Sequence, residues 1–441
     1  MEEQLTIVSD LTKQVREIPD RWSWIEPSIW TDRMLFTLKR GVKGGKWFSL
    51  IDKVYRISTL EVAYKLVKRN NGAAGVDKES VARFTRHKDE KLCKLKELLM
   101  SDRYLPQAVK RVWIDKPGRK KEKRPLGIPT VRDRIVQAAL RMVIEPIFEQ
   151  VFADHSYGFR PKSGCKDALR QVWKFYTSGY NYVLDADLKS YFDTIDHEIL
   201  MSMISEKISD SRILRLIEIY LKQEVLDTAK RWTPDRGTPQ GAVISPLLAN
   251  IFLNPLDHKM TNLGYKMVRY ADDFVIMCKT REEAETALNL VKEWCEEMKL
   301  TLHPTKTKIV NSLEEPFVFL GYKFKGGKRY VSDKSMVKFR DKLRPLTKRT
   351  NGHSIDTIIK LLNPILRGWF EYYKHAHKNV SREVDGWIRN RLRGILRKRA
   401  GKKGRARGAD NQRYPIAYFD ELGLFSMVVN RKIAVAKARS G

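Results

Sequence analysis

The pattern of apolar and polar residues along this chain predicts both helices and strands, without a regular alternation of the two. Long segments have apolar residues at helical spacing, and shorter apolar runs between turn-forming residues are typical of strands. The expected helices are Leu5 to Ile18, Trp47 to Lys68, Val131 to Glu149, Ile199 to Gln223 as one or two helices, Glu282 to Met298, and Ile355 to Leu366. The expected strands are Val109 to Trp113 in a hairpin-like stretch, Tyr182 to Leu188, two strands within Met267 to Lys279, and Phe317 to Phe324.

Two clusters of turn-forming residues mark candidate domain boundaries. Asn70-Asn71-Gly72, with Gly75 shortly after, ends the helical pattern near the N-terminus. Gly326-Gly327 precedes a strongly basic region that is mainly helical from Asp333 onward. Because such clusters interrupt regular structure, we expect boundaries near residues 75 and 325.

The charge of the chain points to a polyanionic partner. The 441 residues include 85 Lys and Arg against 53 Asp and Glu, which gives a net charge of +32. Residues 331–441 hold 27 of the basic and 9 of the acidic residues, and Arg389 to Arg407 contains ten basic residues and no acidic one. Like charges at this density repel each other unless phosphates neutralise them, so nucleic acid is the expected partner and this run an expected phosphate-binding segment.

Other features argue against a secreted or membrane protein. The longest uncharged apolar stretch, Gly241 to Leu256, is too short to cross a bilayer, and the N-terminus opens with Met-Glu-Glu. The cysteines Cys93, Cys165, Cys278 and Cys295 lie far apart with no C-x-x-C pair. We expect reduced thiols, no structural zinc module and no membrane association.

Two groups of carboxylates lie next to apolar runs. Asp185 and Asp187 are two residues apart at the end of an expected strand, so both face the same side of the sheet. Asp272 and Asp273 lie between two short apolar strands. An Asp-Asp pair is often a solvated turn, but carboxylates among apolar strands repel each other and lose hydration unless a cation holds them. A pair of Mg²⁺ ions, about 3.5 to 4 Å apart as in phosphoryl transfer, is therefore expected here.

A third element is the turn Gly237-Thr238-Pro239-Gln240-Gly241, which an apolar helix-like run follows. Gly241 permits close approach of the backbone, and Gln240 can donate and accept hydrogen bonds at a base or sugar edge. Such loops are common before helices, so this one gains weight only from its neighbours. Asp193 and Asp196 are expected at a helix start or cap, outside the site.

The order of these three elements resembles the palm of a reverse transcriptase, and the detailed sequence of each is similar to that of bacterial group II intron reverse transcriptase/maturases. The segments that carry the resemblance are Arg124 to Pro129 with Asp133-Arg134, Ser156 to Pro161, Asp187 to His197 (motif A), Gly237 to Asn250 (motif B), Tyr270 to Asp273 (the YADD box), Leu302 to Lys308, Phe319 to Tyr322, and Arg367 to Tyr373 of the thumb. It covers most of the chain. It implies an α+β right-hand polymerase, with fingers and palm built on an antiparallel sheet flanked by helices, and then a helical thumb.

The resemblance also implies a division of the chain into four regions. Residues 1–75 would be an N-terminal helical extension with the start of the fingers, and 76–325 the fingers and palm. Residues 326–395 would be the helical thumb or maturase domain, and 396–441 a basic nucleic-acid-binding segment.

The same resemblance implies a metal-binding role for particular residues. Asp187 and Asp272 would be the principal Mg²⁺ ligands, assisted by Asp273. Leu188 would belong to the same metal-binding positions, and Asp185 is the alternative ligand.

A second set of residues would bind the incoming dNTP. The position of Phe192 resembles a steric gate, which would reject a ribose 2′-hydroxyl by clash. Arg124 would contact the triphosphate, and Lys306 would lie near the leaving pyrophosphate. The complete expected set is Arg124, Leu188, Lys189, Ser190, Tyr191, Phe192, Gln240, Gly241 and Lys306.

The implied function is that of an RNA-directed DNA polymerase of a group II intron, which adds dNTPs to a DNA primer on an RNA template. It would also bind structured intron RNA, assist splicing and retrohoming, and act on target DNA in the bacterial cytoplasm, near the nucleoid during insertion. Two alternatives remain: an RNA-binding splicing factor or chaperone with little polymerase activity, or a reverse transcriptase of a defence or diversity-generating element. Both a monomer and a dimer are open.

One departure from the family pattern concerns the C-terminal region. Many relatives end in a Cys/His zinc-bearing endonuclease module, but no cysteine follows Cys295 and the sequence ends 34 residues after Arg407. The expectation is a compact type without the zinc endonuclease module or a second-strand nuclease.

Overall fold

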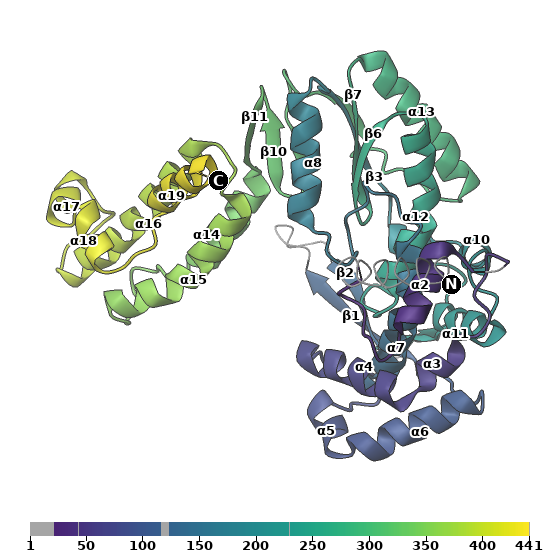
Figure 1. Ribbon diagram of the computed structural model, residues 1–441. Coiled ribbons are helices and arrows are strands. Elements are labelled where there is room, and N and C mark those ends of the chain that lie inside the picture. The colour runs from purple at the N-terminus through teal and green to yellow at the C-terminus, as the bar shows by residue number, and fades with distance from the viewer. Residues whose placement is uncertain (1–21, 43, 116–122, 229, 441) are drawn as a thin grey trace, which may run out of the picture. The chain divides into compact units, whose positions relative to one another are not determined.

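The computed structural model describes residues 22–42, 44–115, 123–228 and 230–440, and for 437–440 the backbone alone. These residues divide into two compact units (Figure 1): the first comprises 22–115, 123–175 and 184–309, and the second 176–183 and 310–440. The helix expected from Leu5 to Ile18 lies outside the described residues. Across the described ranges, no helix is both long enough and apolar enough to span a membrane.

Helices form most of the first unit. They are α2 (Asp32–Arg40), α3 (Ile51–Tyr55), α4 (Ile57–Asn70), α5 (Val81–Arg86), α6 (Lys88–Met100), α7 (Val131–Glu149), α8 (Cys165–Thr177), α9 (Tyr191–Thr194), α10 (His197–Ser205), α11 (Ser211–Leu221), α12 (Ser245–Asn262) and α13 (Arg281–Glu297). The last two residues of α8 belong to the second unit.

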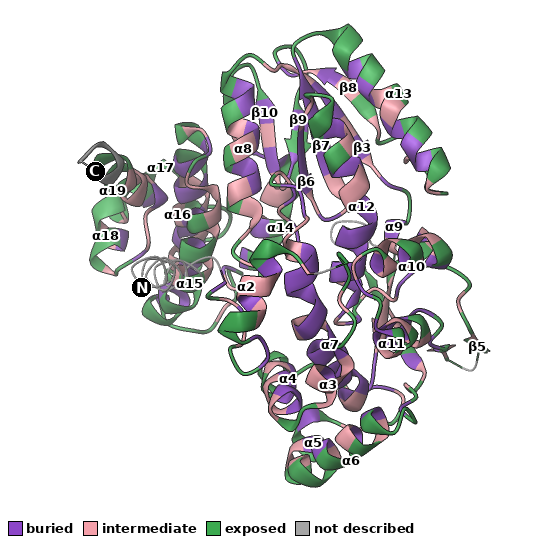
Figure 2. Cartoon of the chain, turned by 45° about the vertical axis from the view of Figure 1, so that its right-hand side comes forward, coloured by how far each residue is buried: buried purple, intermediate pink, exposed green. Residues whose placement is uncertain are grey.

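Helix α7 forms much of the core of the first unit and is buried over nearly its whole length (Figure 2). It has the bounds expected from the sequence, and the Thr130 hydroxyl caps its start by accepting a hydrogen bond from the Asp133 amide at 3.2 Å. Pro146 has no N–H to donate, so the Met142 carbonyl four residues earlier lacks an intrahelical partner. That carbonyl instead accepts a hydrogen bond from Trp30 Nε1 at 3.2 Å, which ties the N-terminal segment to the core.

The strands of the first unit form two four-stranded sheets. They are β1 (Val109–Asp115), β2 (Lys123–Ile128), β3 (Tyr182–Asp187), β4 (Val225–Asp227), β5 (Lys230–Trp232), β6 (Lys266–Tyr270), β7 (Asp273–Cys278) and β8 (Lys308–Asn311), of which β3 and β8 cross the boundary between units. One sheet has the order β2-β1-β4-β5, and its antiparallel β1–β2 pair confirms the expected hairpin. The other has the order β6-β7-β3-β8, with α12 packed against β6 and α13 against β7. Strand β7 is buried at every position after Asp273, as its continuous apolar run requires.

The segment Trp47 to Lys68 does not form the single helix expected from its apolar spacing. Helix α3 ends before Arg56, whose ψ of 131° lies outside the helical region, and α4 follows. The buried carboxylate of Asp210 accepts hydrogen bonds from the backbone N–H groups of Leu50 at 2.7 Å and Ile51 at 2.9 Å. A residue about 160 positions away therefore sets where α3 begins, which apolar spacing alone could not reveal.

The second unit combines a three-stranded antiparallel sheet with six helices in the described part of the chain. Its strands are β9 (Phe317–Phe319), β10 (Tyr322–Lys325) and β11 (Lys328–Val331), in the order β11-β10-β9. Its helices are α14 (Asp333–Leu343), α15 (Ile355–Tyr373), α16 (Lys378–Arg399), α17 (Gly408–Arg413), α18 (Ile416–Glu421) and α19 (Met427–Ser440). The expectation of a mainly helical region from Asp333 is confirmed.

The single strand expected from Phe317 to Phe324 is wrong, because the chain turns in its middle. Leu320 and Gly321 both have positive φ, 48° and 79°, and join β9 to β10. A Cβ on Gly321 would lie 2.6 Å from the hydroxyl of Tyr373, so this turn needs glycine both for its backbone and for its packing. Gly326-Gly327, where the sequence suggested a boundary, forms the next turn, between β10 and β11.

Several arginines of the basic run Arg389 to Arg407 serve as internal hydrogen-bond donors. Arg393 is 7% exposed and donates to the Tyr414 carbonyl at 2.8 Å, and Arg397 forms an ion pair with the buried Asp410 at 2.9 Å. Arg391 donates to the Thr347 carbonyl at 3.1 Å. The run is thus part structural, and its exposed members are the ones available to phosphate. They include Lys398, Lys402, Lys403 and Arg405.

Candidate active site

The YADD box forms a tight turn between β6 and β7. Tyr270 and Asp273 are opposite each other in this antiparallel pair, so Ala271 and Asp272 make a two-residue loop. Ala271 has a φ of 59°, a left-handed conformation that is uncommon for a residue with a Cβ. The two expected strands around an acidic turn are confirmed.

The segment Ser156 to Phe159 packs against this turn. Tyr157 donates its backbone N–H to the Arg269 carbonyl, and the Arg269 N–H donates to the His155 carbonyl, both at 2.9 Å. A Cβ on Gly158 would lie 2.1 Å from the Ala271 nitrogen, so only glycine fits there. Tyr157 and Gly158 of the Ser-Tyr-Gly-Phe-Arg-Pro signature thus pack directly against the acidic turn.

The second pair of carboxylates comes from β3, the strand next to β7 in the sheet. Asp185 and Asp187 are both partly exposed while Ala186 between them is buried, which confirms that they share a face. The Asp187 carbonyl accepts a hydrogen bond from the His303 N–H at 2.7 Å. This contact brings the Leu302 to Lys308 segment to the end of β3, where Lys306 Nζ forms an ion pair with Asp187 Oδ2.

Burial and repulsion from neighbouring carboxylates raise the pKa values of Asp273 and Asp185. Burial raises the pKa of Asp273 to about 7, with further repulsion from Asp185, Asp272 and Asp187. Burial likewise raises the pKa of Asp185 to about 6, with repulsion from Asp187. The four carboxylates therefore influence one another across β3 and the β6–β7 turn. A cation would relieve this repulsion.

Positive groups already counter part of the charge. Burial raises the pKa of Asp272, and the charges of Arg124 and Arg269 act in the opposite direction. Arg124 is thus close enough to act on the acidic turn, and its expected contact with the triphosphate of a dNTP stays a prediction. Its side chain comes from β2, in the other sheet.

The donor set suits Mg²⁺, although it is not a closed metal site. No group of three or more His, Cys, Asp and Glu side chains within the described ranges converges to hold a metal, and Asp187 pairs with Lys306 instead. Mg²⁺ is commonly held by one or two carboxylates together with substrate phosphates and water, so Asp187 and Asp272 match its preference. The Leu188 side chain is buried, at 3% exposure, which leaves only its main-chain oxygen for a cation.

Backbone contacts join motif A to the motif B loop. The Thr238 N–H donates to the Phe192 carbonyl at 2.7 Å, and the Gln240 carbonyl accepts from the Gly127 N–H at 2.7 Å. Gly241 has a φ of 108°, and a Cβ there would lie 2.6 Å from the Gly127 carbonyl oxygen. The close approach expected of Gly241 is thus an approach to β2, and it places Phe192 and Gln240 on neighbouring segments.

The remaining residues of motif A have mixed positions. Lys189 donates its N–H to the Thr301 carbonyl at 2.8 Å, and Ser190 has a φ of 51° where the chain leaves β3. Tyr191 is 2% exposed and its hydroxyl donates to the Ala249 carbonyl at 2.6 Å, so its ring packs inward. Asp196 caps α10, as expected, by accepting from the Glu198 and Ile199 amides, both at 3.1 Å.

Asp193 lies in the first turn of the short α9, as expected of a residue at a helix start, while the N-cap position belongs to Ser190. Asp193 also lines a cavity of about 520 Å³ together with Gln240, Arg111, Trp113 and Trp232. The Arg111 guanidinium carbon lies 4.7 Å from the Trp232 ring centroid and 5.6 Å from that of Trp113. Aromatic rings beside a guanidinium suit the binding of unpaired bases.

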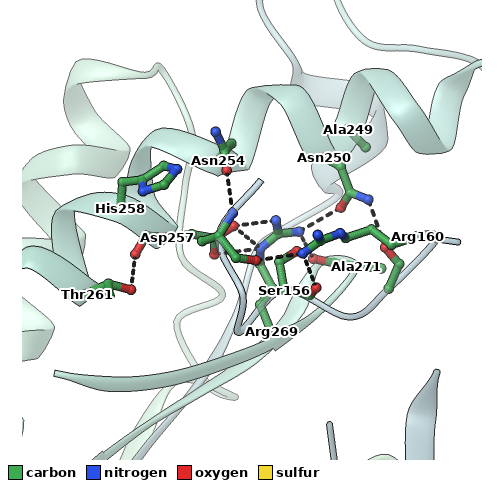
Figure 3. Close-up of polar contacts among 12 residues, drawn as sticks. Ser156, Arg160, Ala249, Asn250, Asn254, Asp257, His258, Thr261, Arg269 and Ala271 are labelled. Atoms are coloured by element: carbon green, nitrogen blue, oxygen red, sulfur yellow. Dashed lines mark hydrogen bonds and ion pairs between the residues drawn. The ribbon is translucent and has the colours of Figure 1, made fainter. Parts of the chain in front are cut away.

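The buried side of the acidic turn is held by residues that the sequence analysis did not include in the site. Arg269 is fully buried, and it contacts Asp257 and Asn250 of α12 as well as the Ala271 carbonyl (Figure 3). One signal was available, since Arg269 is a charged residue that directly follows the apolar Met267 and Val268 within β6. Its side-chain partners lie 12 and 19 positions earlier, on the preceding helix α12, and nothing in their spacing identified them.

Comparisons with known proteins agree with this arrangement. The family described as reverse transcriptase (RNA-dependent DNA polymerase) matches residues 114–324, and the group II intron, maturase-specific domain matches residues 336–414. The group II intron-encoded protein LtrA of Lactococcus lactis subsp. cremoris is 30% identical over 416 residues, which cover 76% of this chain and 67% of that protein. Protein YkfC of Escherichia coli (strain K12) is 36% identical over 272 residues, covering 52% of this chain and 70% of that protein.

The fold and the matched domains define a reverse transcriptase with an α+β architecture, joined to a maturase domain. The chain belongs to the family of group II intron-encoded reverse transcriptase/maturases. It is an RNA-directed DNA polymerase, and the maturase-specific domain fits a role in splicing.

Proposed function

We propose that Asp187, Asp272 and Asp273 form the polymerising centre of this enzyme. The observation that carries this proposal is that β3 and β7 are neighbours in one sheet, which places their carboxylates and the β6–β7 turn close together; there, burial first and repulsion among the carboxylates second raise the pKa of Asp273 to about 7. Two Mg²⁺ ions would be held by Asp187 and Asp272 with help from Asp273. When bound, they would neutralise the charge of the dNTP phosphates and lower the pKa of the primer 3′-hydroxyl. Asp185 remains the alternative ligand.

The surrounding residues would position the nucleotide for in-line attack by the primer 3′-hydroxyl. Arg124 would hold the triphosphate with its guanidinium fork, and Lys306 would shift from Asp187 toward the leaving pyrophosphate. Phe192 would pack against the sugar and exclude a ribose. Gln240 and Gly241, held against β2, would line the base and sugar.

The template strand would enter beside this centre. The cavity of about 520 Å³ next to Gln240 offers Trp113 and Trp232 as surfaces for an unpaired template base and Arg111 as a contact for its phosphate. We therefore assign the RNA template to this wall of the first unit. The DNA primer would end at Asp187 and Asp272.

The second unit would bind structured intron RNA and assist its splicing. Its exposed cations, including Lys398, Lys402, Lys403 and Arg405, provide charge for an RNA backbone. Trp369 and Tyr373 are unsuited to base stacking, because their rings pack on one another at 4.8 Å and Trp369 stacks on Phe339 at 4.4 Å. Retrohoming into target DNA would follow in the cytoplasm, with the same cations available to that DNA.

Primer extension on an RNA template with Mg²⁺ and dNTPs tests the polymerase assignment. Asp272→Asn should abolish extension while leaving RNA binding unchanged, since the amide keeps the size of the side chain and removes its charge. Asp89→Asn is the matched control, because Asp89 lies on α6 with its side chain 83% exposed. If the chain were instead a chaperone with a retained palm fold, the unmodified chain and both variants would bind RNA equally well. None of the three would extend a primer.

A further inference from the structure

The guanidinium of Arg269 is fully buried beside Ala271 (Figure 3). Ala271 and Asp272 form the turn between β6 and β7, which is the catalytic turn of the proposed centre. Its Nε donates to Asp257 Oδ1 at 2.8 Å and Oδ2 at 3.0 Å, and Nη2 also donates to Asp257. Its Nη1 donates to Asn250 Oδ1 and to the Ala271 carbonyl, both at 2.9 Å. One side chain thereby connects α12 to the residue that precedes Asp272.

The polar residues of α12 form a continuous anchoring face. Asn250, Asn254 and Asp257 are spaced four and three residues apart, which places them on one side of the helix. Asn250 Nδ2 donates to the Gly158 carbonyl at 2.7 Å, and Asn254 Oδ1 accepts from the Ala153 N–H at 3.2 Å. The helix therefore holds both the segment beneath the catalytic turn and, through Arg269, the turn itself.

The turn needs such an anchor because its conformation is unfavourable by itself. Ala271 is left-handed at φ 59°, and the neighbouring carboxylates repel one another. A buried charge is tolerated only when it is paired and fully hydrogen-bonded, which fixes the orientation of the guanidinium fork. A fork held in this way fixes the direction of the Ala271 carbonyl, and with it the peptide that leads into Asp272.

We propose that Arg269 is a positioning residue for polymerisation, which sets the geometry of Asp272 through the Ala271 carbonyl. The inference rests on the proposed function, because it needs Asp272 to be part of the catalytic centre. Arginine is required because one group must reach Asp257, Asn250 and Ala271 at the same time. A lysine side chain ends in a single nitrogen, which can replace the bonds of Nη1 to Asn250 and Ala271 but cannot at the same time supply the paired bonds of Nε and Nη2 to Asp257.

Arg160 provides a matched comparison from the same region. It is also nearly buried, with 10% of its side chain exposed, and its Nε donates to Glu149 at 3.0 Å. It donates to the Ala153 and Ser156 carbonyls at 2.6 and 2.7 Å. These bonds make it a structural anchor like Arg269, but none of them reaches the acidic turn. Changing Arg160 therefore measures how much stability and activity are lost when a buried arginine near the site is replaced but the turn keeps its own contacts.

The test compares Arg269→Lys with Arg160→Lys in the full chain, measuring primer extension, primer–template binding and thermal unfolding. Arg269→Lys should lower kcat by about tenfold or more and raise the Mg²⁺ concentration for half-maximal rate, because small misplacements of catalytic groups cost large factors in rate. The Kd for primer–template should stay within about twofold, because binding uses other residues. Arg160→Lys should lower the melting temperature without this change in kcat or Mg²⁺ dependence.

Three outcomes would overturn the proposal. The first is a normal kcat and Mg²⁺ dependence in folded Arg269→Lys, and the second is an equal loss of kcat in Arg160→Lys. Should Arg269→Lys fail to fold, the double variant Arg269→Gln with Asp257→Asn removes both buried charges together and is expected to fold with low kcat. The third outcome is that neither Arg269→Lys nor this double variant folds, which would mean that the contacts of Arg269 serve folding alone. An active Asp272→Asn would instead overturn the proposed function, which separates the two ideas.

Discussion

Lys306 and Asp187 form an ion pair although 119 positions separate them in the sequence. The pair exists because the backbone of His303 bonds to the end of β3, which brings the following loop to the carboxylate. A lysine paired with Oδ2 of Asp187 would compete for this carboxylate with the proposed Mg²⁺ ion. The pair therefore predicts two opposite effects when the lysine is removed.

Lys306→Met should lower kcat for dNTP addition by about tenfold, because in the proposed centre no cation would then lie near the leaving pyrophosphate. The same change should tighten Mg²⁺ binding to the free enzyme, because Asp187 loses its competing partner. Isothermal titration with Mg²⁺ and single-turnover extension measure the two effects. Lys299→Met serves as the control, since Lys299 is 61% exposed and pairs with Asp196 instead. Weaker Mg²⁺ binding in Lys306→Met would contradict the competition.

Phe192→Val should relax the choice between deoxynucleotides and ribonucleotides. A smaller side chain leaves room for a 2′-hydroxyl, so the ratio of kcat/KM for dNTP over rNTP should fall by about tenfold or more. Phe48→Val is the comparison, since Phe48 is 72% exposed. The steric role of Phe192 is refuted by an unchanged ratio in a variant that still extends with dNTPs.

Gly158→Ala should disable the enzyme by displacing the backbone of the acidic turn. A Cβ at this position would lie 2.1 Å from the Ala271 nitrogen, so the turn must shift, at a cost of about 1–3 kcal/mol in stability. Chemical denaturation and primer extension should both register the change. Gly368→Ala on α15 is the control, because a Cβ at this position meets nothing within 4 Å. This variant should have a free energy of unfolding about 0.5–1 kcal/mol higher than that of the unmodified chain. Full activity in Gly158→Ala would show that the turn tolerates movement.

Replacing Lys398, Lys402, Lys403 and Arg405 with Gln should weaken RNA binding without unfolding the protein. All four are exposed, and the slope of log K against log salt should become shallower by about 0.7 to 0.9 for every RNA phosphate that is no longer neutralised. Arg393→Gln should behave in the opposite way, because Arg393 is 7% exposed and bonds to the Tyr414 carbonyl. It should lower the melting temperature and leave the salt slope unchanged. Salt titrations of binding and thermal unfolding separate the two groups.

The sequence by itself determined many of the local elements, though not the division between α3 and α4 or between β9 and β10, and it determined the class of enzyme. Val131 to Glu149 is a helix with the expected bounds because its apolar spacing and its Thr130 cap are both local. Asp185 and Asp187 share a face because side chains alternate along a strand. The acidic turn and the motif order were likewise readable, and the matches to reverse transcriptase and maturase families agree with them.

Only the tertiary structure decided which distant groups meet. Asp210 starts α3, and Lys306 reaches Asp187, through contacts that no spacing along the chain encodes. Arg269 and Asn250 interrupt apolar runs in the sequence, but in the fold they are partners behind the acidic turn. The physical reason is that a buried polar group must find its partner in three dimensions, and the partner can come from any segment that folding brings near.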